Sequence, residues 1–266
     1  MNIMDTISKI REPQVAGMFY PAEPEACAAL VARSLAAAKP SAADRAKLVI
    51  APHAGHVYSG PIAATVYKPL EKARDRISRV VLVGVAHRVP FKGIVTTGAT
   101  HWKTPLGLVP IDGDWLHRAG VPVMEEAFAG EHSLEVHLPF LQTVLGDFAL
   151  LPLIVGGASH QEVADVLERV WGGPETLIVI SSDMSHFHDY ETAQRLDAAT
   201  RAAIEALEPE RLSGEGACGY RAIGGALLQA RKRDMRVTGV DFRNSGDTAG
   251  ARDRVVGYGA FIMEYA

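Results

Sequence analysis

The chain has little cysteine, no long apolar run and no excess of positive charge, and each absence excludes a class of protein. Its 266 residues include two cysteines, too few for a disulfide framework. Residues 1–13 lack the apolar core of a signal peptide, so we expect a reducing, cytoplasmic location. No apolar stretch approaches the roughly 20 residues that cross a bilayer, so we expect no membrane association. Lysine and arginine are scattered evenly at a formal net charge of -4, which argues against nucleic-acid binding.

Several common enzyme signatures are also missing. The sequence has no Gly-x-Ser-x-Gly elbow and no Walker loop, so the corresponding enzyme classes are set aside. What the chain does have is apolar residues, 48% of the total, enough for a large core. Three nearly continuous aliphatic runs, 48–51, 80–83 and 177–180, are typical of strands that are covered on both faces.

The order of the expected elements predicts an α/β fold. Helical patterns alternate with the aliphatic runs, which favours parallel strands, and a Gly- and Pro-rich stretch at 93–124 indicates a meander that adds mixed strands. We therefore predict a single domain over 1–266, with a central mixed, largely parallel sheet flanked by helices and a flexible segment at 1–12. Helices are expected at 25–38, 60–73, 133–145, 161–170, 191–206 and 217–232, with further strands at 150–155, 235–242 and 255–263.

Two of the aliphatic runs end in a turn that carries a histidine. His53 and His87 come after neighbouring predicted strands, and strand ends gather at one edge of an open α/β sheet. Two histidines and a carboxylate form the open metal site of many non-haem Fe(II) proteins, and Asp247 is the candidate carboxylate. Each histidine can instead be a hydrogen-bonded structural residue, and the Asn-Ser-Gly-Asp-Thr sequence around Asp247 is also good turn chemistry.

Two further segments supply candidate catalytic residues. Asp183 and His186 follow the third aliphatic run, and their spacing of three brings both side chains to one side of a turn, as an acid/base pair requires. The alternative is an Asp that caps a helix beside a passive His. In Glu-His-Ser-Leu-Glu-Val-His, the histidines are five apart, unlike the zinc-protease motif, and His132 is the better candidate for contact with a substrate. Cys218 can be a nucleophile or a buried small side chain.

Five motifs together resemble the Memo family, in order and from about residue 12 to the C-terminus. They are Val-Ala-Gly-Met-Phe-Tyr-Pro (15–21), Ala-Pro-His-Ala-Gly (51–55), Glu-His-Ser-Leu-Glu-Val-His-Leu-Pro-Phe (131–140), Ser-Ser-Asp-Met-Ser-His (181–186) and Asn-Ser-Gly-Asp-Thr (244–248). That family is similar in fold to the LigB-like class III extradiol dioxygenases, which cleave catechol rings with non-haem Fe(II) and O2.

The resemblance implies a ligand set and partners. The family's metal-site histidines fall on His53 and His87, and the third position, a cysteine in animal members, is matched to Asp247. Fe(II) is then the expected cofactor, with copper or zinc as alternatives, and Asp183 with His186 matches the acid/base position of the dioxygenases. The Gly-Val-Ala-His sequence ending at His87 departs from the family's usual Gly-Pro-Ser-His or Gly-Thr-Ser-His. AMMECR-type and radical SAM proteins are the partners that the family association implies.

Three hypotheses follow from these residues. The leading one is a metal-dependent oxidoreductase of the extradiol-dioxygenase type, in which His186, oriented by Asp183, moves a proton and His132 shapes the pocket for a catechol-like substrate. The second is a non-catalytic module that binds a metal, a peptide or a protein on the same scaffold. The third is a metal-free cluster whose side chains satisfy one another by hydrogen bonds.

Overall fold

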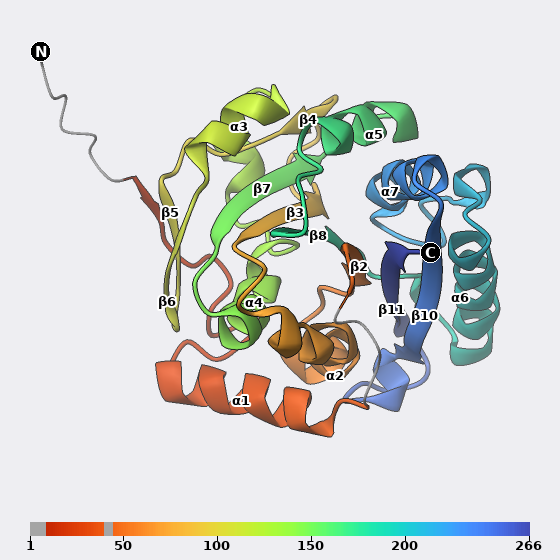
Figure 1. Cartoon of the computed structure of the whole chain (residues 1–266). Coiled ribbons are helices and arrows are strands. Elements are labelled where there is room, and N and C mark those ends of the chain that lie inside the picture. The colour runs from red at the N-terminus through yellow and green to blue at the C-terminus, as the bar shows by residue number, and fades with distance from the viewer. Residues whose placement is uncertain (1–8, 40–44) are drawn as a thin grey trace, which may run out of the picture.

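A mixed sheet forms the centre of the computed structural model, which describes residues 9–39 and 45–266 (Figure 1). In this part of the chain the strand order is β10-β11-β2-β8-β3-β7-β4, and β9 pairs with β11. The four inner strands β2, β8, β3 and β7 are parallel, whereas the outer strands are antiparallel to their neighbours. The predicted mixed, largely parallel sheet is therefore confirmed. The strands are β2 (Leu48–Ala51), β3 (Arg79–Val85), β4 (Ile94–Val95), β7 (Ala149–Val155), β8 (Thr176–Ser181), β9 (His186–His188), β10 (Met235–Asn244) and β11 (Val255–Tyr265).

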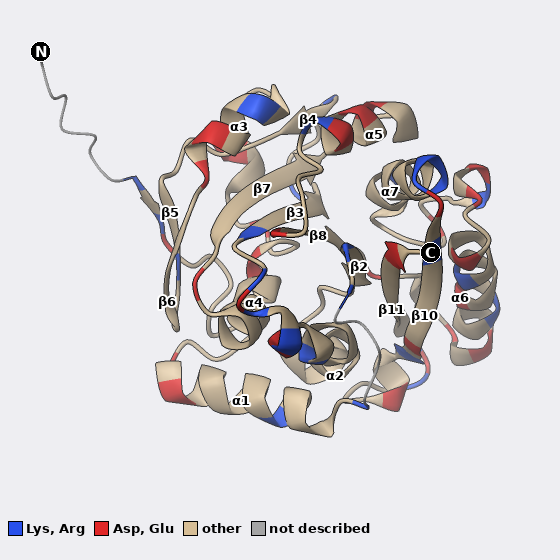
Figure 2. Cartoon of the chain, in the orientation of Figure 1, with Lys and Arg blue, Asp and Glu red and all other residues tan. Residues whose placement is uncertain are grey.

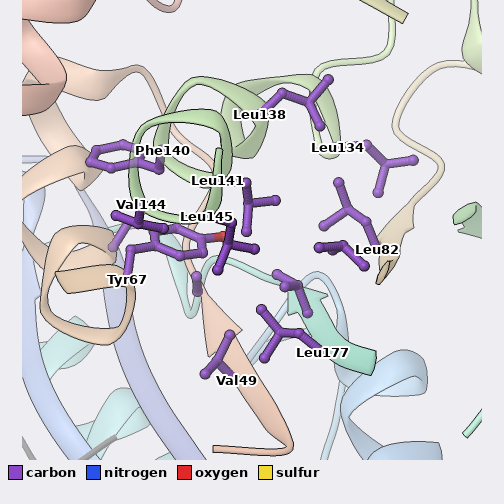
Figure 3. Close-up of a cluster of buried hydrophobic side chains, with 14 of the residues drawn as sticks. Val49, Tyr67, Leu82, Leu134, Leu138, Phe140, Leu141, Val144, Leu145 and Leu177 are labelled. Atoms are coloured by element: carbon purple, nitrogen blue, oxygen red, sulfur yellow. The ribbon is translucent and has the colours of Figure 1, made fainter. Parts of the chain in front are cut away.

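Helices cover both faces of this sheet, as an α/β domain requires (Figure 1). Alternate strand residues face opposite ways: Val49 packs into the core under α1, α2 and α4, and Ile50 into the core under α3, α5, α6 and α7. Figure 3 shows the first of these cores. In Figure 2, the ribbon positions of charged residues lie mainly on the outer helices and loops, while the inner strands carry few. The helices are α1 (Pro24–Ala37), α2 (His56–Tyr67), α3 (Gly113–Ala119), α4 (Leu138–Leu145), α5 (His160–Arg169), α6 (Tyr190–Glu205) and α7 (Tyr220–Lys232).

A small second sheet, in the order β1-β5-β6, lies at one side of the domain. It contains β1 (Ile10–Arg11), β5 (His101–Thr104) and β6 (Gly107–Pro110). Of the segment predicted to be flexible, residues 1–8 lie outside the described residues, and Ile10 and Arg11 form β1, which pairs with β5. The 93–124 stretch also holds α3, which the sequence reading missed. Its first turn is capped by Asp112, whose side chain accepts a hydrogen bond from the Trp115 main chain.

Three predicted helices start at least three residues away from their predicted first residue, and one of them is α7, which begins at Tyr220 and not at 217. α2 begins at His56, four residues before the predicted start at Gly60, and Pro61 lies inside it. The helix predicted at 133–145 is divided into a 3₁₀ turn at Glu135–His137 and α4, because Pro139 begins a new helix near its own position. Other 3₁₀ turns lie at Lys68–Ala73, Glu125–Phe128, Pro209–Arg211 and Ser245–Asp247.

The parallel strands bring the functional segments to one edge of the sheet. β8 pairs with β2 on one side and with β3 on the other. β2 and β3 are therefore not adjacent, although in a simple βαβ unit they would be. The carboxyl ends of the three strands nevertheless meet at the same edge, where the chain continues into the segments that carry His53, His87 and Asp183. Within the described ranges, no helix has the length and apolar character needed to span a membrane.

Candidate metal centre

Three histidines converge at this edge of the sheet. His53 follows β2, His87 follows β3, and His132 comes from the loop before the 3₁₀ turn at 135–137. One nitrogen from each ring lies within 4.8 Å of the others, a spacing that lets one metal ion bind all three. The ring centroids are 5.1 Å apart for His53 and His87, and 4.6 Å apart for His87 and His132, which stack. His53 and His87 therefore meet as predicted, and His132 is the third member rather than a pocket residue alone.

In the described part of the chain, Asp247 is not a member of this group, so the structure brings His132 and not the predicted Asp247 together with His53 and His87. It ends the 3₁₀ turn at Ser245–Asp247, where its carboxylate accepts a hydrogen bond from the Asn244 main chain at 3.0 Å. The Tyr190 hydroxyl donates to the other carboxylate oxygen at 2.6 Å. The alternative reading, that this segment is turn chemistry, is correct, because the carboxylate satisfies donors of the turn and of α6.

Glu131 is the carboxylate that serves the centre, although it does not join the three ligands. Its buried side chain accepts hydrogen bonds from His87 Nδ1 at 3.0 Å and from the main chains of His87, His132 and Ser133 at 2.7 to 2.9 Å. Burial raises the pKa of this carboxyl, but the hydrogen bonds and His87 outweigh burial and lower it to about 2. An ionised carboxylate only accepts, so His87 Nδ1 carries the proton and Nε2 is left for a metal.

Two of the three imidazoles, those of His53 and His132, are held in the neutral form that binds metals. Burial, followed by the neighbouring histidines, lowers the pKa of His53 well below its usual range. Burial and His87 also lower the pKa of His132 to about 4. Because a neutral ring keeps a free lone pair, these two residues can bind a metal at neutral pH without first losing a proton.

Cys218 also lies at the centre, and the sequence reading did not place it there. Its sulfur is 3.4 Å from His53 Nε2 and 3.8 Å from Ser182 Oγ. Burial raises the pKa of this thiol to about 12, which argues against a free nucleophilic thiolate. The family resemblance matched the cysteine of animal members to the position of Asp247, but the cysteine that lies near the three histidines in this structure is Cys218.

Asp183 and His186 lie at the same edge but do not form the predicted pair. Asp183 Oδ1 accepts a hydrogen bond from the His53 main chain at 2.7 Å, and no hydrogen bond joins it to His186 among the described residues. Burial raises the pKa of Asp183 to about 7. His186 begins β9, which pairs with β11, and burial lowers its pKa. The next residue, Phe187, has a φ of 63°, an unfavourable conformation for a bulky side chain.

Two separate cavities reach the histidine group. One, of about 410 Å³, is bordered by His132, Asp183 and His186, and aromatic side chains of Phe19, Tyr58 and Tyr258 also line it. The other, of about 430 Å³, is bordered by His87 and Cys218. A metal held by the three histidines would therefore be open to small molecules, as a catalytic site requires and a closed structural site does not.

The N-terminal segment completes the wall around His132. Phe19 packs on the His132 ring, with centroids 4.5 Å apart. Buried Glu135 holds this segment, because it pairs with Arg11 at 2.5 Å and accepts hydrogen bonds from the Val15 main chain and the Tyr20 hydroxyl. The sequence reading assigned no role to Glu131 or Glu135; their position beside histidines in the 131–137 motif is the only signal that pointed to them.

Comparison with known proteins gives full-length matches. A family model described as "Memo-like protein" matches residues 11–262. A "MEMO1 family protein" of Aquifex aeolicus is 36% identical, with 96% of this chain and 99% of that protein aligned. Proteins of the same description from Archaeoglobus fulgidus and Thermoplasma acidophilum are each 33% identical, over 96% and 95% of this chain and 99% and 98% of theirs.

Proposed function

Because this chain belongs to the Memo family, we propose that His53, His87 and His132 bind Fe(II) in an oxidoreductase of the extradiol-dioxygenase type. The observation that carries the proposal is the convergence of three imidazole nitrogens at the end of parallel strands, beside a cavity. Imidazole is a good ligand for iron, copper and zinc, so the donor set fits the group that the family resemblance implies. Copper and zinc are the alternative ions.

The residues around the centre have distinct roles in this proposal. A bound ferrous ion would supply redox chemistry and free coordination positions for a chelating substrate and O2. Phe19, Tyr58 and Tyr258 line the cavity beside His132 with aromatic rings, which suits a flat, catechol-like molecule. His186, in the wall of the same cleft, would take a proton from a substrate hydroxyl or return it.

Asp183 has a different role from the one its spacing predicted. Its carboxylate binds the main chain of His53, and so fixes the position of that ligand rather than the ring of His186. His186 would therefore act without a carboxylate partner. The proton transfer by His186 would then depend on its contact with the substrate and not on a neighbouring carboxylate.

A second candidate function is non-catalytic binding of a peptide or protein. Two exposed aromatic residues favour it, because Tyr58, which lines the cleft, is 38% exposed and Phe187, next to His186, is 60% exposed. Exposed aromatic side chains beside a cleft are typical of protein contact sites. AMMECR-type and radical SAM proteins are the partner classes we propose from the family association, and a cytoplasmic location is proposed with them.

Metal analysis of matched variants tests the centre. The protein is purified anaerobically, offered Fe(II), Zn(II) and Cu(I) separately, and the bound metal is measured by mass spectrometry. We expect about one iron per chain, lost in His87→Ala and His132→Ala and kept in Asp247→Asn, which serves as the matched control. Loss of metal in Asp247→Asn, or no stoichiometric metal in the parent, would refute the three-histidine centre.

Oxygen uptake separates the two functions once a metal is bound. With a panel of catechols, the iron-loaded parent should consume O2 and His186→Ala should not, although it keeps its iron. Absence of turnover in the fully loaded parent across the panel would favour the binding function instead.

A further inference from the structure

A chain of buried hydrogen bonds extends from the rear of His53 into the apolar core. Ser181 Oγ lies 2.6 Å from His53 Nδ1 and 2.8 Å from His137 Nε2. The other nitrogen of His137, Nδ1, lies 2.7 Å from the hydroxyl of Tyr67. All four side chains belong to residues that are at most 1% exposed, so they satisfy one another without water.

Counting protons fixes the direction of every bond in this chain. Ser181 Oγ also bonds the carbonyl oxygen of Ser133, which can only accept, so the single hydroxyl proton of Ser181 is used there. The two imidazole nitrogens that face Ser181 must then both be N–H donors. A neutral imidazole has one such proton, so His53 Nε2 and His137 Nδ1 are bare. The hydroxyl of Tyr67 donates to the bare nitrogen of His137. Each hydrogen-bonding atom from His53 Nδ1 to the Tyr67 hydroxyl then has a partner in this series.

We infer that Ser181, His137 and Tyr67 are positioning residues that hold His53 in the Nδ1–H tautomer, with the lone pair of Nε2 turned toward His87 and His132. The inference rests on the proposed function, since it gives this tautomer a use in metal binding. His53 Nε2 is the nitrogen that faces the centre, because it is the one 3.4 Å from Cys218 Sγ. This series of hydrogen bonds therefore fixes the tautomer of His53, as Glu131 fixes the tautomer of His87.

The two supports differ because their surroundings differ. Glu131 collects main-chain N–H groups that balance its charge, whereas the position behind His53 is apolar. Tyr67 stacks on Phe140, with centroids 5.5 Å apart, and lies among Leu141, Val144 and Leu145 (Figure 3). A carboxylate there would be a buried charge without partners, so a neutral chain of hydroxyls and imidazole is the less costly support.

The tautomers can be measured directly in the metal-free protein. Long-range ¹H–¹⁵N spectra of ¹⁵N-labelled protein in a chelator distinguish the two nitrogens of each ring. We expect opposite tautomers, Nδ1–H for His53 and Nε2–H for His137, assigned from single His→Gln variants. His53 with its proton on Nε2 would overturn the inference. This readout needs no metal, so a failure of the proposed metal centre would leave it unaffected and the two failures can be told apart.

Variants then test whether the chain supports metal binding. Ser181→Ala should give His53 mixed tautomers and weaken Fe(II) and Zn(II) binding about 10- to 100-fold, the usual effect of removing a ligand's supporting partner. Tyr67→Phe keeps the ring packing and should shift the tautomer of His137, with a smaller loss of affinity. Ser34→Ala is the matched control and should change neither, because the buried Ser34 hydroxyl donates to the Leu30 carbonyl of its own helix, α1. A folded Ser181→Ala or Tyr67→Phe protein with unchanged tautomers would refute the inference that these hydrogen bonds set the tautomer of His53.

Discussion

Acidification of the metal-free protein is expected to lower its stability well above the pH at which carboxylates titrate. Burial lowers the pKa of His56 to about 4, of His132 to about 4 and of His137 to about 3. An unfolded histidine has a pKa of 6.5, so the unfolded chain takes up these protons first. The stability that depends on neutral histidines is therefore complete above about pH 6.5 and is lost as the pH falls toward 4.

The size of the effect follows from the number of protons exchanged on unfolding. Near pH 5 the three histidines would bind about three more protons when unfolded, each worth about 1.4 kcal/mol per pH unit. Asp183 acts in the opposite direction, because burial raises its pKa from 3.8 to about 7 and its proton is released on unfolding. The net uptake of about two protons gives a loss of about 3 kcal/mol per pH unit. Burial lowers the pKa of His53, which adds to this loss, and raises the pKa of Asp197, which subtracts from it.

Urea unfolding at intervals between pH 7 and pH 5, in a chelator, measures this slope. The variant His56→Asn should reduce it by about 1.4 kcal/mol per pH unit, because one proton is removed from the balance. His117→Asn, which replaces an exposed histidine of α3, is the matched control and should leave the slope unchanged. A stability that stays flat from pH 7 to pH 5.5 would refute the reasoning that these imidazoles are buried and neutral.

Three further variants test individual contacts. Glu131→Gln should weaken metal binding about 10- to 100-fold, because it replaces the carboxylate that holds His87. Chelator competition measures the affinities of variant and parent, and equal affinities would contradict this role of Glu131. Gly84→Ala should cost about 1 to 3 kcal/mol in urea unfolding, since a Cβ there would lie 2.7 Å from the side chain of Leu134; equal stability would mean that the loop moves freely. Glu135→Gln should cost about 3 to 5 kcal/mol, because it leaves the buried arginine of the N-terminal segment unpaired, and an equal unfolding midpoint would contradict this role.

The part of the fold that the sequence predicted is the part with strong periodicity. The aliphatic runs at β2, β3 and β8 have few alternatives to buried parallel strands, so their existence and the placement of His53 and His87 at one edge of the sheet followed from pattern alone. Their order in the sheet did not, because β8 lies between β2 and β3. Short strands such as β5 and β9, and the helix α3, have too few residues for a periodic signal. Their formation depends on contacts with distant segments, such as the pairing of β9 with β11.

The candidate site was predicted only where a strand carries it. His132 and Glu131 lie in a loop, and their contacts with His87 depend on how that loop folds across the sheet edge, which spacing does not record. Asp247 was chosen because a carboxylate completes a common ligand set, but local turn donors bind it more directly than a distant metal could. Local hydrogen bonds are decided within a few residues, whereas a metal site is decided by the tertiary fold.

The charge of the centre limits what it can bind. Three neutral imidazoles leave a divalent ion with its full positive charge. Glu131 is not one of the three ligands, and its carboxylate directly supports the ring of His87. In a buried site of low polarity such an excess of positive charge favours anionic ligands and lowers the pKa of any hydroxyl that coordinates the ion. The neutral chain behind His53 preserves this excess, because it fixes the ligand without adding a second negative charge. A deprotonated phenol or another small anion should therefore bind the metal-loaded centre more tightly than its neutral analogue.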